Sequence, residues 1–205
     1  NEKTGVGPDL VGRAPLKPFA DVNEMVSKLS RLFHRMSTDL GEKFDMLVEM
    51  DTLDLDTRKG KAPGGYQYYL QKSRVPFIFM NAAGLQGDLE TMIHEAGHAF
   101  HSIYCGHLEL IGERSYPIEF AEVASMSMEL MTQNEWGEFY NDEEANRARL
   151  GHLEGVIFLL PWIATIDSFQ HWIYSNPGHT RDERKAVWNS IRDRFGSNME
   201  WGDYQ

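Results

Sequence analysis

The sequence contains very little cysteine, since Cys105 is the only one. A single thiol excludes a disulfide framework within the chain and any metal site built from several cysteines. Disulfides persist mainly in oxidising compartments. The composition therefore favours a cytoplasmic location.

Long apolar runs and positive charge are also scarce. The strongest apolar run, residues 156–162, is much shorter than the roughly 20 residues of a membrane-spanning helix, so it predicts a buried helix and no membrane partner. The 20 Lys and Arg residues against 31 Asp and Glu residues give a formal net charge of −11. Phosphate-rich partners repel such a chain, so we expect no nucleic acid and no anionic membrane as partner.

The most informative segment that is present is H-E-A-G-H at residues 94–98. Positions four apart share one face of a helix, so His94 and His98 can each offer an imidazole nitrogen to a single metal ion. Glu95 lies one position further round the helix, within reach of a water molecule on that metal. The pattern is typical of zinc peptidases in which the glutamate is the general base.

The motif requires a helix, and the surrounding sequence predicts one over residues 88–104. Asp88 is a candidate cap, and residues 105–106 a candidate end. Gly97 costs a helix about 1 kcal/mol relative to alanine, which predicts an element packed closely against it. An isolated H-E-x-x-H also arises by chance in purely structural helices, so the zinc hypothesis depends on a third ligand. The apolar positions that recur at helical spacing are Leu89, Met92, Ile93, Ala96 and Phe100.

Two known spacings of the third zinc ligand do not fit. The pattern H-E-x-x-H-x-x-G-x-x-H fails because His101 and Tyr104 occupy the glycine and third-histidine positions. A glutamate about twenty residues after the second histidine would fall on Pro117 or Ile118, which cannot bind a metal through their side chains.

Glutamates do occur on the next predicted helix, residues 117–129. Glu119, Glu122, Ser125 and Glu129 repeat there at near-helical spacing, so one polar face can turn toward the metal. Glu122 is the preferred ligand. For Glu119 and Glu129 we expect either a solvent-exposed position or a hydrogen bond to a ligand.

Four segments together resemble a known family. The set is similar to the oligoendopeptidase F and thimet oligopeptidase family of zinc peptidases, and closer to the oligoendopeptidase F branch. The resemblance implies Glu122 as third ligand, a mostly helical fold, and cleavage of short peptides inside a deep channel. The segments are residues 58–66 (RKGKAPGGY), 75–81 (VPFIFMN), 94–101 (HEAGHAFH) and 120–125 (FAEVAS).

The chain departs from this family in its late portion. Family members have several hundred residues, and the resemblance implies a later histidine and tyrosines that stabilise the tetrahedral intermediate. A weaker resemblance continues through residues 167–174, but no segment that matches this histidine and these tyrosines follows Glu129. The sequence also begins at Asn1 rather than at methionine. We therefore expect residues 1–205 to form a single domain or lobe, the central catalytic portion of a larger peptidase. The alternative to an active endopeptidase is a zinc- and peptide-binding piece without turnover.

The fold predicted from these patterns is mainly α and zincin-like, with a small β-sheet before the zinc helix. Residues 1–19 form an irregular lead-in. The resemblance implies that the second of two short strands lies beside the active site and can pair with an extended peptide. The strands are expected at 66–70 and 75–81, and the further helices at 21–40, 43–50, 143–174 (kinked or divided at Pro161) and 180–195.

The predicted site consists of His94, His98 and Glu122 around one zinc ion per chain, with Glu95 as catalytic base and oligopeptides as substrates. Ligating histidines usually donate their second nitrogen to a carboxylate or carbonyl. The candidates considered for that role are Glu129, Ser125 and Asp167, and His101 is expected to be a packed structural histidine.

Overall fold

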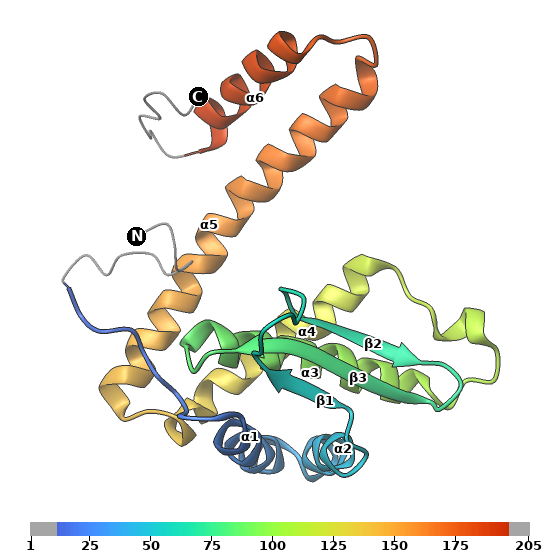
Figure 1. The fold of residues 1–205 in the computed structure, drawn as a ribbon, viewed down its shortest axis with the longest axis vertical. Coiled ribbons are helices and arrows are strands. Elements are labelled where there is room, and N and C mark those ends of the chain that lie inside the picture. Colours follow the sequence, from blue (N-terminus) through green and yellow to red (C-terminus); the bar gives the residue numbers. More distant parts are fainter. Residues whose placement is uncertain (1–11, 197–205) are drawn as a thin grey trace. The chain divides into compact units, whose positions relative to one another are not determined.

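The structure is a computed structural model that describes residues 12–196. The chain divides into two compact units, Asn1–Ala148 and Arg149–Gln205 (Figure 1). Residues 12–19 have no regular secondary structure, as predicted, while the first eleven residues of the expected lead-in lie outside the described part. The single domain or lobe expected from the sequence stays a prediction.

The first unit is mainly helical, which confirms the predicted fold class. Its helices include α3, which carries the H-E-A-G-H motif, and α4, which carries Glu122. The bounds are α1 Val22–Met36, α2 Thr38–Glu49, α3 Gln86–Cys105 and α4 Ile118–Thr132, with short 3-10 turns at Ile111–Arg114 and Gln133–Glu138.

The predicted helix over residues 21–40 is wrong at its end, because the backbone is extended at Ser37 (φ −164°, ψ 131°). Asp21 caps α1, and its side chain accepts a hydrogen bond of 2.9 Å from the Glu24 N–H. Serine competes for backbone hydrogen bonds in non-helical conformations, which favours such a break. Thr38 then starts α2, which includes the short helix predicted at 43–50.

The sheet has three strands in the order β1-β3-β2, one more than predicted. The added strand β1 (Leu53–Asp56) runs parallel to β3 (Val75–Ala82), and β2 (Tyr66–Leu70) runs antiparallel to β3. Ile78 of β3 therefore faces Leu53 on one side and Gln67 on the other. The predicted peptide pairing with residues 75–81 is wrong, because this strand is central and both its edges are occupied. The two edge strands of the described sheet are β1 and β2.

The core of this unit holds α3 in place. Phe33 and Phe100 meet edge to face at 5.0 Å between ring centroids, and Phe33 lies 5.1 Å from Phe44. All three rings are almost fully buried. Because α1, α2 and α3 each contribute one of these rings, the motif helix is fixed by aromatic packing along its apolar face.

The prediction that an element packs closely against Gly97 is confirmed, and this element is α4. A Cβ atom at Gly97 would lie 2.7 Å from Ser125 Cα, 2.9 Å from the Ala124 carbonyl oxygen and 3.1 Å from Met128 Cβ. Real Cβ atoms do not approach backbone so closely, so only glycine permits this separation of the two helices.

The second unit contains most of α5 (Asp142–Ser175) and α6 (Arg181–Phe195). Thr180 caps α6 and forms the predicted capping box with Glu183. The two helices contact each other through Trp188, whose ring lies 4.8 Å from that of Phe169. Pro161 lies inside α5, which continues through it as one helix.

The burial predicted for residues 156–162 is wrong within the described chain. Phe158 is 72% exposed and Leu160 is 66% exposed, whereas Trp162 at the end of the run contacts Trp188 of α6. By length and apolar composition α5 can also cross a membrane, which corrects the expectation that no segment approaches a membrane span.

The Gly97→Ala substitution is expected to destabilise the protein by about 1–3 kcal/mol, because the added methyl group pushes α4 away from α3. Urea unfolding measures the change. Gly87→Ala is the matched control on the same helix, since a Cβ there meets nothing within 4 Å. This control is expected to be neutral or to gain up to about 1 kcal/mol. Equal stability of the two variants would contradict the close-approach explanation.

Candidate metal centre

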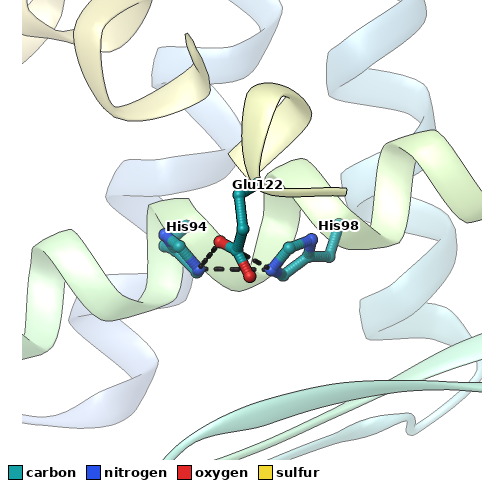
Figure 2. A group of neighbouring side chains, drawn as sticks. All are labelled: His94, His98 and Glu122. Atoms are coloured by element: carbon teal, nitrogen blue, oxygen red, sulfur yellow. Dashed lines mark hydrogen bonds and ion pairs between the residues drawn. The ribbon is translucent and has the colours of Figure 1, made fainter. Parts of the chain in front are cut away.

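Three polar side chains from two helices converge at one point (Figure 2). His94 and His98 extend from α3, and Glu122 reaches between them from α4. The two histidine Nε2 atoms are 3.2 Å apart. Glu122 Oε2 lies 3.3 Å from His94 Nε2 and 3.8 Å from His98 Nε2.

This arrangement has the size and chemistry of a zinc site. Zinc bonds to nitrogen and oxygen are about 2.0–2.1 Å long, so neighbouring ligand atoms of a tetrahedral site are about 3.3 Å apart. The three separations lie near that value, and all three ligand atoms fall within 4.8 Å of one another. Two imidazoles and one carboxylate are the donor set of some catalytic zinc sites, and such a set would keep a fourth coordination position for water.

A hydrogen bond orients each of the three side chains. Glu129 Oε1 lies 2.6 Å from His94 Nδ1. This contact turns the other ring nitrogen of His94, Nε2, toward His98 and Glu122. A ring N–H of His98 donates to the backbone carbonyl of Ala121. Ser125 Oγ donates to Glu122 Oε2 at 3.0 Å. Such contacts fix the histidine tautomer and hold the ligand atoms together before a metal binds.

Glu129, Ser125 and Asp167 were the predicted hydrogen-bond partners of His94 and His98, and one of them, Glu129, contacts a histidine of this pair. Glu129 contacts His94, whereas Ser125 contacts Glu122. Asp167 belongs to the second unit, where its carboxylate lies 3.7 Å from His171. Glu119 is exposed to solvent at the start of α4.

Glu95 lies beside this group in a cleft of about 410 Å³. Only 7% of the residue is exposed, and burial raises the pKa of its carboxyl above the ordinary value. Its carboxylate also accepts a hydrogen bond from the backbone N–H of Gln67 in β2. The other residues that line the cleft are Gly65, Gly87, Glu90, Thr91, His94 and Glu129.

The two histidines differ in their electrostatic surroundings. Burial disfavours the charged form of His94, but the hydrogen bond and negative charge of Glu129 outweigh it and raise the His94 pKa above its ordinary value. Burial lowers the pKa of His98, and the neighbouring His94 lowers it further.

His101 is packed rather than directed at the three converging side chains, as expected. Its ring stacks on Tyr116 with 3.9 Å between centroids and 16° between planes. Burial lowers the pKa of His101.

Two features of the cleft were missed from the sequence. Gln67 reaches Glu95 through its backbone, and backbone hydrogen bonds leave no residue-type signal. Gly65 lies against α3, since a Cβ there would be 2.9 Å from Thr91 Cγ2. The glycine pair at 64–65 was the available signal for that approach.

The fold and the site define a mainly α, zincin-like domain in which one helix supplies H-E-x-x-H and the next supplies a glutamate. The model of peptidase family M3 matches residues 23–201. The chain therefore belongs to peptidase family M3.

Similar proteins agree with this family. A chromosomal oligoendopeptidase F of Lactococcus lactis subsp. cremoris is 25% identical over 162 residues, which cover 79% of this chain and 25% of the relative. A crystal structure named for an oligoendopeptidase F of Bacillus anthracis str. Ames is 33% identical with a TM-score of 0.84, over 90% of this chain and 34% of that one. PZ peptidase A, solved with an inhibitor, is 33% identical with a TM-score of 0.85, over 92% and 33%. The chain thus spans between a quarter and about a third of the length of these relatives.

The histidine pKa values provide a direct test of the site in metal-free protein. His94 is expected to titrate above the ordinary histidine value, and His98 and His101 below it. Glu129→Gln is expected to lower the His94 pKa. NMR titration of the imidazole signals measures all three, with Glu119→Gln as the exposed control.

The same pair predicts a pH dependence of stability. Since folding raises the pKa of His94, its pairing with Glu129 stabilises the folded state fully below the unfolded pKa, and the effect is lost as the pH rises through the folded pKa. Glu129→Gln is therefore expected to destabilise metal-free protein more in mild acid than in mild alkali. A His94 that titrates below His98 would contradict this account.

Proposed function

We propose that this chain carries the active site of a zinc-dependent endopeptidase that hydrolyses oligopeptides. The main support is the convergence of His94, His98 and Glu122 beside the cleft that contains Glu95. One zinc ion per chain is expected at these three residues. Membership of peptidase family M3 and the likeness to oligoendopeptidases support the reaction class.

In this proposal a bound zinc ion supplies Lewis acidity that polarises a water molecule and the scissile carbonyl. Glu95 takes the proton of that water and delivers it to the leaving amine. Burial raises the Glu95 pKa, which makes its carboxylate a stronger base near neutral pH. The Gln67 N–H holds this carboxylate toward the cleft.

An extended peptide is expected to pair with the free edge of β2. Hydrogen-bonding groups of alternate residues point to the same side of an antiparallel strand. Because the Gln67 N–H is directed at Glu95 rather than at β3, the backbone groups of Gly65 and Tyr69 are expected at the same edge. Strand addition there would bring the substrate backbone past the general base.

A second candidate function is binding of zinc and peptide without turnover. This second candidate is supported by the length of the chain, which corresponds to at most about a third of the length of its relatives. Groups that stabilise the tetrahedral intermediate then fall outside this chain. Turnover by the 205-residue chain, compared with that of a longer protein that includes it, separates the two functions.

The proposal also includes the cellular location and the partners of the protein. We expect a cytoplasmic enzyme, because the chain has a single cysteine, and oligopeptides as its partners. The formal net charge of −11 argues against nucleic acid and an anionic membrane as partners. A membrane-binding assay would test whether the exposed apolar side chains of α5 bind lipid.

Glu95→Gln is expected to retain zinc and to lower kcat by at least about 10²–10⁴-fold, because the amide cannot accept the proton of water. A quenched fluorescent oligopeptide measures cleavage, with and without chelator, in the full protein that contains this chain. Glu119→Gln, an exposed carboxylate on α4, is the matched control and should leave kcat unchanged. Turnover at the wild-type rate in Glu95→Gln would refute the assignment of the base.

His98→Ala is expected to lose most bound zinc, since it removes one of three ligands. Glu129→Gln should keep the ligands but weaken zinc affinity by about 10–100-fold, because it removes the hydrogen-bond partner of His94. Metal analysis after dialysis against a competing chelator measures both variants. Stoichiometric zinc in His98→Ala would indicate a different ligand set.

A further inference from the structure

A second pocket, of about 300 Å³, shares no lining residue with the cleft but is lined by Gln67, whose backbone N–H donates to Glu95. Gln67 and Tyr69 extend into it from the face of β2 that packs on α3, and Ser102 borders it from the last turns of α3. The connection between α3 and α4 completes the wall. The remaining lining residues are Tyr68, Gln71, Arg114, Ser115 and Tyr116.

Arg114 places a buried positive charge in this wall. The residue is only 7% exposed, and its guanidinium donates to the carbonyls of Leu108 at 2.8 Å and Glu109 at 2.9 Å and to Gln71 Oε1 at 3.2 Å. All three acceptors are neutral, and no carboxylate of residues 12–196 forms an ion pair with Arg114. A guanidinium has five N–H donors, so donor capacity and positive charge both remain. Buried charges are normally paired.

Two further donors in the pocket have no internal partner. Gln67 Nε2 and Tyr69 Oη are both buried atoms without a hydrogen bond in the described part of the chain. Buried polar groups are nearly always satisfied, so an orphaned pair needs an explanation. Together with Arg114 they give the pocket an excess of donors and one uncompensated positive charge, which fits an anionic acceptor with two oxygens.

The position of the pocket connects it to the proposed reaction. Gln67 donates its backbone N–H to Glu95 and extends its side chain into the pocket. From Gln67 to Leu70, its last residue, β2 advances about 10 Å, at about 3.3 Å per residue. A peptide paired along β2 would therefore bring a group to the pocket within about four residues of the scissile bond.

We propose that the pocket formed by Arg114, Gln67 and Tyr69 binds a carboxylate of the peptide substrate. This inference rests on the proposed peptidase function, which it deepens by assigning a substrate feature. The carboxylate has two possible sources: the C-terminus of a short peptide or an Asp or Glu side chain.

The test measures binding in the zinc-loaded full protein with Glu95→Gln, where bound peptides are not cleaved. Calorimetry compares one neutral octapeptide as C-terminal acid and as C-terminal amide, and a series of amides with Glu or Gln at each position. The carboxylate form is expected to bind at least tenfold more tightly than its neutral partner. The arm in which this preference appears identifies the source.

Two variants connect the preference to the pocket. Arg114→Met is expected to abolish it, and Tyr69→Phe to reduce it at least threefold. Tyr69→Phe removes a hydroxyl that makes no internal hydrogen bond, so the fold should be kept and the result remains decisive even if Arg114→Met fails to fold. Tyr66→Phe is the control on the same strand, since Tyr66 stacks on Phe79 and does not line the pocket.

Equal binding of acid and amide forms in every arm would overturn the inference, and so would a preference that survives Tyr69→Phe unchanged. Cleavage of the same peptides by protein with Glu95 intact separates this inference from the proposed function. Cleavage without a carboxylate preference refutes the pocket assignment alone. A pocket-dependent preference without cleavage refutes the peptidase alone.

Discussion

The close contact between α3 and α4 at Gly97 is the constraint on which the site depends. The missing side chain lets the backbone of Ser125 approach α3, and Glu122 stands one turn earlier on the same helix. At this separation a glutamate side chain reaches the two histidines. Any wider spacing would leave two imidazoles on one helix, which is too few ligands for a stable zinc site.

Electrostatics then favour a divalent cation at this point. Three carboxylates, Glu95, Glu122 and Glu129, surround the two histidines, and their charges hold the His94 pKa high. The same negative potential that stabilises a proton on His94 would stabilise a metal ion held by His94, His98 and Glu122. Because ligands must be deprotonated, proton and metal would compete for one nitrogen of His94.

In the proposed function, the edge strand β2 links this group of side chains to the peptide substrate. Its backbone contacts Glu95, while its side chains on the α3 face line the donor-rich pocket around Arg114. Under the two proposals above, β2 would therefore hold the general base at one point and bind a substrate carboxylate at another. Its position follows from the strand order, in which β3 takes the centre and leaves β2 at an edge.

Local sequence patterns predicted the features of the site that depend on helical spacing. The repeat of four placed His94 and His98 on one face of α3, and Gly97 indicated a close neighbour. Glu122 was chosen by its position on a polar face and by family resemblance, because the spacing between helices is a tertiary property. The break at Ser37, the strand β1 and the exposure of residues 156–162 depend on packing between distant segments, which local periodicity does not encode. The Gln67 contact was missed because it is made by backbone.

X-ray absorption at the zinc edge of zinc-loaded protein would report the type and distance of the ligands. If His94, His98 and Glu122 hold one zinc ion, the spectrum shows nitrogen and oxygen donors at about 2.0–2.1 Å with outer-shell scattering from two imidazoles. Three imidazoles, a sulfur donor from Cys105, or protein that takes up no zinc would contradict this ligand set.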